Sequence, residues 1–161
     1  MLAALADTPG RTANLGHALG AGRDSLVRAL RELVELGLIA RNEGYGHPLR
    51  PEYLVLPAGA ELIPAGVELV HALERLDATE PGLKKWSMPV VHALAAGPRR
   101  FSELRELLPG VTARALTLAL KDLVAVGLVE RTVTDGFPPS TLYRLTAAAE
   151  PLLAPLDRLA N

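Results

Sequence analysis

The sequence predicts an α+β fold made of two similar halves, each a group of helices followed by a two-stranded β-hairpin. Three observations predict it. The segment LVRALRELVELGLIAR at 26–41 returns ninety positions later as LTLALKDLVAVGLVER at 116–131, with eight of sixteen residues identical. In both segments the apolar residues recur at helical spacing, and the pattern stops at a glycine, Gly37 or Gly127. After each glycine come two short β-prone runs separated by turn residues. A period of ninety is too long for a solenoid repeat, so a duplicated domain is the simpler interpretation.

The bulk properties agree with two small folded domains. The chain has 161 residues, 49% of them hydrophobic, which is far too apolar for a disordered chain. No apolar run approaches the roughly 20 residues that cross a bilayer, so no membrane partner is expected. The N-terminal MLAALADTPGR lacks the basic start and apolar core of a signal peptide, which favours a cytoplasmic location. There is no cysteine, which excludes disulfides, thiol nucleophiles and thiolate metal sites.

The helices are predicted in the same order in both halves. A short helix is expected in RTANLGHALG (11–20) and in RRFSELRELLPG (99–110), where Ser102 is the expected cap. The main helix follows, with Gly22 at its cap position in the first half and Thr112 as N-cap in the second, because a threonine hydroxyl can accept an orphan backbone N–H. A long helix is expected over 60–76, with Pro64 in an early turn. The segment DATEPGLK (77–84) has the composition of a linker.

The strands follow each main helix. The first runs are LIARN (38–42) and LVERTVT (128–134), the turns are GYGHPLRP (44–51) and DGFPPS (135–140), and the second runs are EYLVL (52–56) and TLYRL (141–145). Pro48 and Pro138 match across the ninety-residue offset, as do Tyr53 and Tyr143. A helix-turn-helix completed by a two-stranded wing is a winged helix. We therefore expect two tandem winged-helix domains, at 1–78 and 79–161.

The second half resembles the HxlR family of bacterial winged-helix transcriptional regulators. The matching pieces are KKW (84–86), GPRRFSELRELLPGVTARAL (97–116), KDLVAVGLVERTV (121–133) and FPPSTLYRLT (137–146). The first half resembles the family more weakly, through LRELVELGLIAR (30–41) and HPLRPEYLVLPAG (47–59). The resemblance implies a DNA-binding regulator, usually a homodimer of single domains. This chain departs from that pattern in carrying two domains, in lacking the cysteine that some members use for sensing, and in ending at Asn161, which shortens a helix that commonly contributes to dimer contacts.

In the first half, the exposed face of the main helix is expected to carry Arg23, Arg28 and Arg31. An arginine there can reach guanine edges or phosphates in a major groove with its rigid fork of donors. The alternative is a solvated helix face, on which Arg28 and Arg31 pair with Glu32 or Glu35. Arg50 in the wing is a candidate for the minor groove, although its counterpart in the second half is the uncharged Ser140.

In the second half, the corresponding face shows Arg114, Thr117, Leu118 and Lys121. The family commonly has polar groups near 118 and 119, so Leu118 and Ala119 weaken direct base readout. An exposed leucine can touch a thymine methyl, but it more often marks a protein contact.

Two pairs of residues at helix starts are candidates for phosphate contacts, Arg99 and Arg100 before Ser102, and Arg11 beside Thr12. Each pair can equally be solvated surface. The aromatic residues Trp86, Tyr53 and Tyr143 are expected in the cores rather than stacked on bases.

The charge distribution and the absence of catalytic motifs limit the classes of function that the sequence allows. Residues 1–80 carry 7 Arg against 11 Asp and Glu, a net −4, and residues 81–161 carry 10 Lys and Arg against 7 Asp and Glu, a net +3. No metal-ligand spacing, P-loop or nucleophile elbow is present, so no enzyme activity and no cofactor are expected. We expect a transcriptional regulator that binds double-stranded DNA, as a monomeric pseudo-dimer or a homodimer, with no effector identified. The alternative is a winged-helix protein-interaction module, favoured by the acidic first half and by Leu118.

Overall fold

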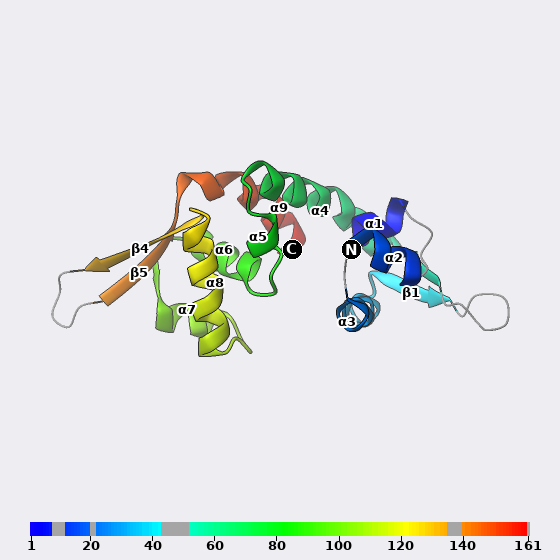
Figure 1. Cartoon of the computed structure of the whole chain (residues 1–161), viewed down its shortest axis with the longest axis horizontal. Helices are drawn as coiled ribbons and strands as arrows, with labels where there is room; N and C mark the ends of the chain where they lie inside the picture. The colour runs from blue at the N-terminus through cyan, green and yellow to red at the C-terminus, as the bar shows by residue number, and fades with distance from the viewer. Residues whose placement is uncertain (8–11, 20–21, 43–51, 135–139, 161) are drawn as a thin grey trace. The chain divides into compact units, whose positions relative to one another are not determined.

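The computed structural model describes residues 1–7, 12–19, 22–42, 52–134 and 140–160 (Figure 1). The chain forms two compact units, Met1–Val67 and Glu68–Asn161, and the division between them falls inside the long helix α4 (Pro57–Arg75). Each unit has its own apolar core. The domain boundary at 78/79 stays a prediction.

Unit 1 begins with α1 (Leu2–Asp7), α2 (Thr12–Leu19) and α3 (Arg23–Glu35). An antiparallel hairpin follows, formed by β1 (Ile39–Asn42) and β2 (Glu52–Val55). The chain then enters α4. The core of the unit consists of one apolar residue from α1, one from α2, two from α3 and one from β1: Leu5, Leu15, Leu26, Leu30 and Ile39.

Unit 2 contains the end of α4, then α5 (Thr79–Gly82), α6 (Ser87–Ala95), β3 (Arg99–Arg100) and α7 (Phe101–Leu107). It continues with α8 (Ala113–Ala125), β4 (Val129–Thr134), β5 (Ser140–Leu145), the short helix η1 (Ala147–Ala149) and α9 (Glu150–Ala160). The hairpin β4–β5 extends away from the helices of the unit (Figure 1). The core of unit 2 includes Val90, Leu94, Leu104, Leu116, Leu123 and Leu152.

The sheet of unit 2 has a third strand that the sequence did not predict. Its order is β3-β5-β4, and β3 pairs Arg99 with Tyr143 and Arg100 with Leu142. The charged pair Arg99–Arg100 has none of the apolar alternation that marks a strand. Pairing with a strand more than forty positions later in the sequence is what makes these two residues β structure.

The local geometry repeats at the ninety-residue offset from the main helix to the end of the hairpin. The helices α3 and α8 have the same length and matching bounds. Gly37 and Gly127 have φ values of 68° and 74°, which confirms the predicted left-handed helix stops. The register is also the same, because Ile39 pairs with Val55 and Val129 pairs with Leu145. That the two units superpose as duplicated domains stays a prediction.

The long helix begins earlier than expected. It starts at Pro57 rather than at residue 60, which places Pro64 eight residues into α4 and not in an early turn. Pro57 is the first residue of α4, where a backbone N–H has no partner within the helix, so proline costs no hydrogen bond there. Pro64 has no N–H to donate to the carbonyl of Ala60, so the backbone ladder of α4 lacks one bond at that point.

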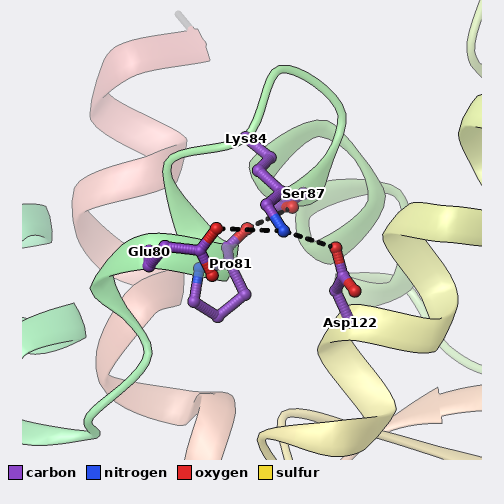
Figure 2. Close-up of polar contacts among 5 residues, drawn as sticks. All are labelled: Glu80, Pro81, Lys84, Ser87 and Asp122. Atoms are coloured by element: carbon purple, nitrogen blue, oxygen red, sulfur yellow. Dashed lines mark hydrogen bonds and ion pairs between the residues drawn. The ribbon is translucent and has the colours of Figure 1, made fainter. Parts of the chain in front are cut away.

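The interpretation of 77–84 as a linker is wrong. Ala78 is fully buried, and the segment after it forms α5. A Cβ on Gly82 would lie 2.6 Å from Leu73 Cδ2, so glycine allows α5 to approach α4 within unit 2. The Ser87 hydroxyl donates to the Pro81 carbonyl at 2.6 Å (Figure 2). Pro81 and Gly82 therefore lie in a short helix that packs within unit 2.

Candidate nucleic-acid interface

The helix α8 buries one face and exposes the other. Leu116, Leu120 and Leu123 pack into the core of unit 2. The Thr112 hydroxyl accepts a hydrogen bond from the Ala115 backbone N–H at 3.1 Å, which confirms the predicted N-cap. Because the buried residues recur at helical spacing, the opposite face is held toward solvent. It carries Arg114, Thr117, Leu118 and Lys121, all of them exposed.

The two cations on this face are unpaired within the part of the chain that the structure describes. Neither Arg114 nor Lys121 lies within ion-pair distance of a described carboxylate. Thr117 is engaged locally, since its hydroxyl donates to the Ala113 carbonyl at 2.8 Å. The face therefore offers two free cationic groups with one leucine between them, and Leu118 is 50% exposed.

The acidic group that follows Lys121 is neutralised from another element. The Lys84 ammonium lies 3.0 Å from Asp122 Oδ2 and 3.1 Å from Glu80 Oε1, so it bridges α8 and α5 (Figure 2). The hydrogen bond to Asp122, and then that to Glu80, raises the pKa of Lys84 above its ordinary value. Because Lys84 already neutralises the Asp122 carboxylate, that carboxylate offsets less of the positive charge of the neighbouring Lys121.

The helix α3 has a similar arrangement in unit 1. Leu26 and Leu30 are buried, and Gly22 provides the N-cap without a side-chain hydrogen bond. Arg23, Arg28 and Arg31 are exposed. All four residues are described, and neither Arg28 nor Arg31 forms the ion pair with Glu32 or Glu35 that the alternative predicts. The face is exposed, as both alternatives require, and only the ion pairs of the solvated-face alternative are not found among the described residues.

The residues at the start of α7 do not form a free anion site. The helix begins at Phe101 with Arg100 as N-cap, so the expected cap at Ser102 is wrong, and Ser102 is the second residue of the helix. The Arg100 backbone N–H donates to Glu103 Oε2 at 2.6 Å. The Glu103 carboxylate thus already accepts the backbone hydrogen bond that a phosphate at this position would need. Arg99 contributes a buried Nε without a hydrogen-bond partner among the described residues, whereas the Arg100 side chain is exposed.

Several predicted residues lie elsewhere. Arg11 and Arg50 fall outside the described residues, as do Pro48 and Pro138, and the Thr12 side chain is likewise not described. The three aromatic residues Tyr53, Tyr143 and Trp86 pack against the cores of their units, which confirms their predicted structural role. Lys85 lies over the Trp86 ring, with Nζ 5.6 Å from its centroid.

Neither a metal-binding group nor a membrane-spanning helix is found among the described residues. No three side chains of His, Asp or Glu in them come together as a metal-binding group. None of the described helices has both the length and the apolar character to cross a membrane.

In unit 2, α7 and α8 form a helix-turn-helix, and the hairpin β4–β5 follows it. This arrangement, with cations on the exposed face of the second helix, defines a winged helix-turn-helix protein. The model of the HxlR-like helix-turn-helix family matches residues 83–161. The chain belongs to this family.

Three relatives illustrate the match. An uncharacterised HTH-type transcriptional regulator of Synechocystis, sll1512, is 34% identical over 94 residues, covering 56% of this chain and 65% of the relative. Another from Halalkalibacterium halodurans, BH0655, is 40% identical over 76 residues, covering 47% of this chain and 67% of the relative. The crystal structure of diamide-treated YodB from Bacillus subtilis is 31% identical and covers 52% of this chain and 83% of that one, with a TM-score of 0.47. The chain spans about half to two thirds of the length of the first curated relatives.

Proposed function

We propose that the chain is a transcriptional regulator that binds double-stranded DNA through two tandem winged-helix domains, at 1–78 and 79–161. The observation that carries the proposal is the exposed face of α8, where Arg114 and Lys121 have no ion-pair partner among the described residues. Of the other cations of unit 2, Lys84, Arg144 and Arg158 are paired with carboxylates, whereas Lys85, Arg105 and Arg131 have no ion pair among the described residues but do not lie on α8. Unpaired cations on a helix that is held outward are what phosphates and guanine edges require.

In this proposal, α3 of unit 1 is a second recognition helix. Arg28 and Arg31 are exposed on α3 without the carboxylate partners that the sequence offers them. Two such helices in one chain would read two half-sites of different sequence. The chain would then act as a monomeric pseudo-dimer, or as a homodimer with four recognition helices. Because such a regulator acts on DNA, and because the named relatives are transcriptional regulators, a cytoplasmic location is part of the proposal.

Phosphate contacts are assigned to side chains rather than to helix starts. Arg100 is exposed and extends from β3, while its backbone N–H is taken by Glu103. Arg99, Ser102 and Arg23 would stand at the edge of the interface. Arg11, Thr12 and Arg50 remain in the proposal as the matching positions of unit 1. Such contacts supply affinity without sequence information.

A second function is favoured by two observations. Leu118 is an exposed leucine on the face that should meet DNA, and residues 1–80 carry a net charge of −4. A winged helix that binds another protein would show both features. This interaction-module function competes directly with DNA binding for the same face of α8.

The test is a selection of bound duplexes from a random-sequence library, followed by binding titrations over a range of salt concentrations. The double variant R114A/K121A should weaken binding and reduce the slope of log K against log salt by about one unit for each phosphate that is no longer neutralised. Arg75→Ala, which removes a charge from α4, is the matched control and should leave the slope unchanged. Absence of any selected duplex, together with a protein captured through α8 in a parallel pull-down, would favour the interaction module instead.

A further inference from the structure

Leu118 occupies the same helix position as Arg28. The helices α3 and α8 have matching bounds at the ninety-residue offset, and the strands after them share one register. Both residues are the sixth of a thirteen-residue helix, and both are exposed. Where unit 1 presents a guanidinium, unit 2 therefore presents a purely apolar side chain.

The surroundings of Leu118 on α8 are cationic. Arg114 precedes it by one turn and Lys121 follows it by nearly one turn, and both lack ion-pair partners among the described residues. Thr117 donates its hydroxyl hydrogen to the Ala113 carbonyl. A lone exposed leucine needs no explanation. Leu118, however, lies between two unpaired cations on the outward face of α8, the second helix of the helix-turn-helix. In a complex with DNA, this position would face a base edge flanked by phosphates.

The chemistry of the major groove limits what a leucine can read there. It has no donor or acceptor, so it cannot distinguish the polar edges of guanine, adenine or cytosine. The C5 methyl of thymine is the one apolar group that the four bases present in that groove. We propose that Leu118 is a specificity-determining residue that reads a thymine through this methyl, while Arg28 reads a guanine from the same position of α3. This rests on the proposed function.

The operator implied is asymmetric. One half-site holds a thymine that cannot be replaced by uracil without a loss of affinity, and the other holds a guanine. A symmetric site would present the same base to two different side chains, and one of the two units would then face a base that it cannot read.

The experiment replaces each thymine of a selected duplex by uracil, which removes only the methyl group. Wild-type protein should lose about three- to fivefold in affinity at one thymine, the amount expected for one buried methyl. L118A should bind the thymine duplex about three- to tenfold more weakly and should be insensitive to uracil at that position. Leu83→Ala, which truncates another exposed leucine of unit 2, is the control and should retain the uracil effect. L118R should shift the preferred base at that position toward guanine.

The outcomes separate the inference from the function on which it rests. A wild-type protein that selects no duplex overturns both. A protein that selects duplexes but shows no uracil-sensitive thymine overturns the role of Leu118 and leaves DNA binding intact. The same conclusion follows if L118A weakens the thymine and uracil duplexes equally, or if it abolishes capture of a protein partner while DNA binding is unchanged. Thermal melting of L118A, with an unchanged midpoint, shows that the variant is folded.

Discussion

Single exposed cations differ in whether they bind bases or phosphates, and a comparison of duplexes distinguishes the two. Removing a side chain that binds a base weakens only the preferred site, whereas removing one that binds a phosphate weakens every sequence. Arg28 lies on the exposed face of α3, while Arg99 and Arg100 lie on the edge strand β3. The two groups should therefore respond differently to truncation.

Arg28→Ala is expected to cost on the order of 1–3 kcal/mol of binding free energy on the preferred duplex and little on random DNA, because the variant cannot form the bidentate hydrogen bonds to guanine. Titrations of both duplexes at one salt concentration measure the difference. Arg75→Ala is the control for the removal of a charge. Equal losses of affinity on the two duplexes would show that Arg28 binds phosphate only.

The double variant R99A/R100A should weaken binding to all duplexes and lower the log–log salt slope by about one unit for each phosphate that the two side chains neutralise. The measurement is the same titration repeated over salt concentration. Arg99 also has a buried Nε, so the single variant R100A is needed to separate a binding effect from a loss of folding. An unchanged slope in both variants would remove β3 from the interface.

At the scale of elements, the packing of α5 decides how unit 2 is built. Gly82→Ala should destabilise the protein by about 1–3 kcal/mol, because the added methyl would overlap Leu73. Gly66→Ala in α4 is the matched control, since a Cβ there meets nothing within 4 Å. It should be neutral or stabilising by up to about 1 kcal/mol. Urea unfolding measures both, and equal effects would contradict the close approach of α5 to α4.

The bridge from Lys84 to Asp122 makes a pH-dependent contribution to the same packing. Because the pKa of Lys84 is raised in the folded state, its contribution is complete below the ordinary value of 10.5 and is lost as pH rises through the folded pKa. The stability difference between the wild type and Lys84→Met should therefore be constant below pH 10.5 and shrink as the pH rises above it. The difference should be small at every pH because the pair is exposed. A difference that grows toward high pH would contradict the bridge.

At the scale of the whole molecule, two winged helices in one chain are proposed to replace part of what homodimerisation supplies. Light scattering should therefore find a monomer or a dimer, both alone and with a selected duplex. If a dimer forms, the long helix α4 is expected to contribute, since it carries partly exposed apolar residues such as Leu62 and Val70. A tetramer whose assembly buries α3 and α8 would contradict DNA binding by those helices.

The sequence by itself determined the features that depend on neighbours along the chain. Helical spacing placed α3 and α8, the glycines at 37 and 127 ended them, and Thr112 capped α8. The hairpins followed from β-prone runs around turn residues. The outward face of α8 could also be predicted, because burying one side of a helix defines the other.

Only the tertiary structure decided the features that join distant residues. The composition around Pro81 and Gly82 predicts a linker, whereas in the folded chain Leu73 packs against Gly82. Arg99 and Arg100 form a strand because β5 lies beside them. Lys84 neutralises a carboxylate 38 positions away, and Arg28 and Arg31 are free of the glutamates that the sequence offers them. The physical reason is the same in each case: propensity and periodicity act over a few residues, whereas burial, strand pairing and ion pairing depend on which segments the fold brings together.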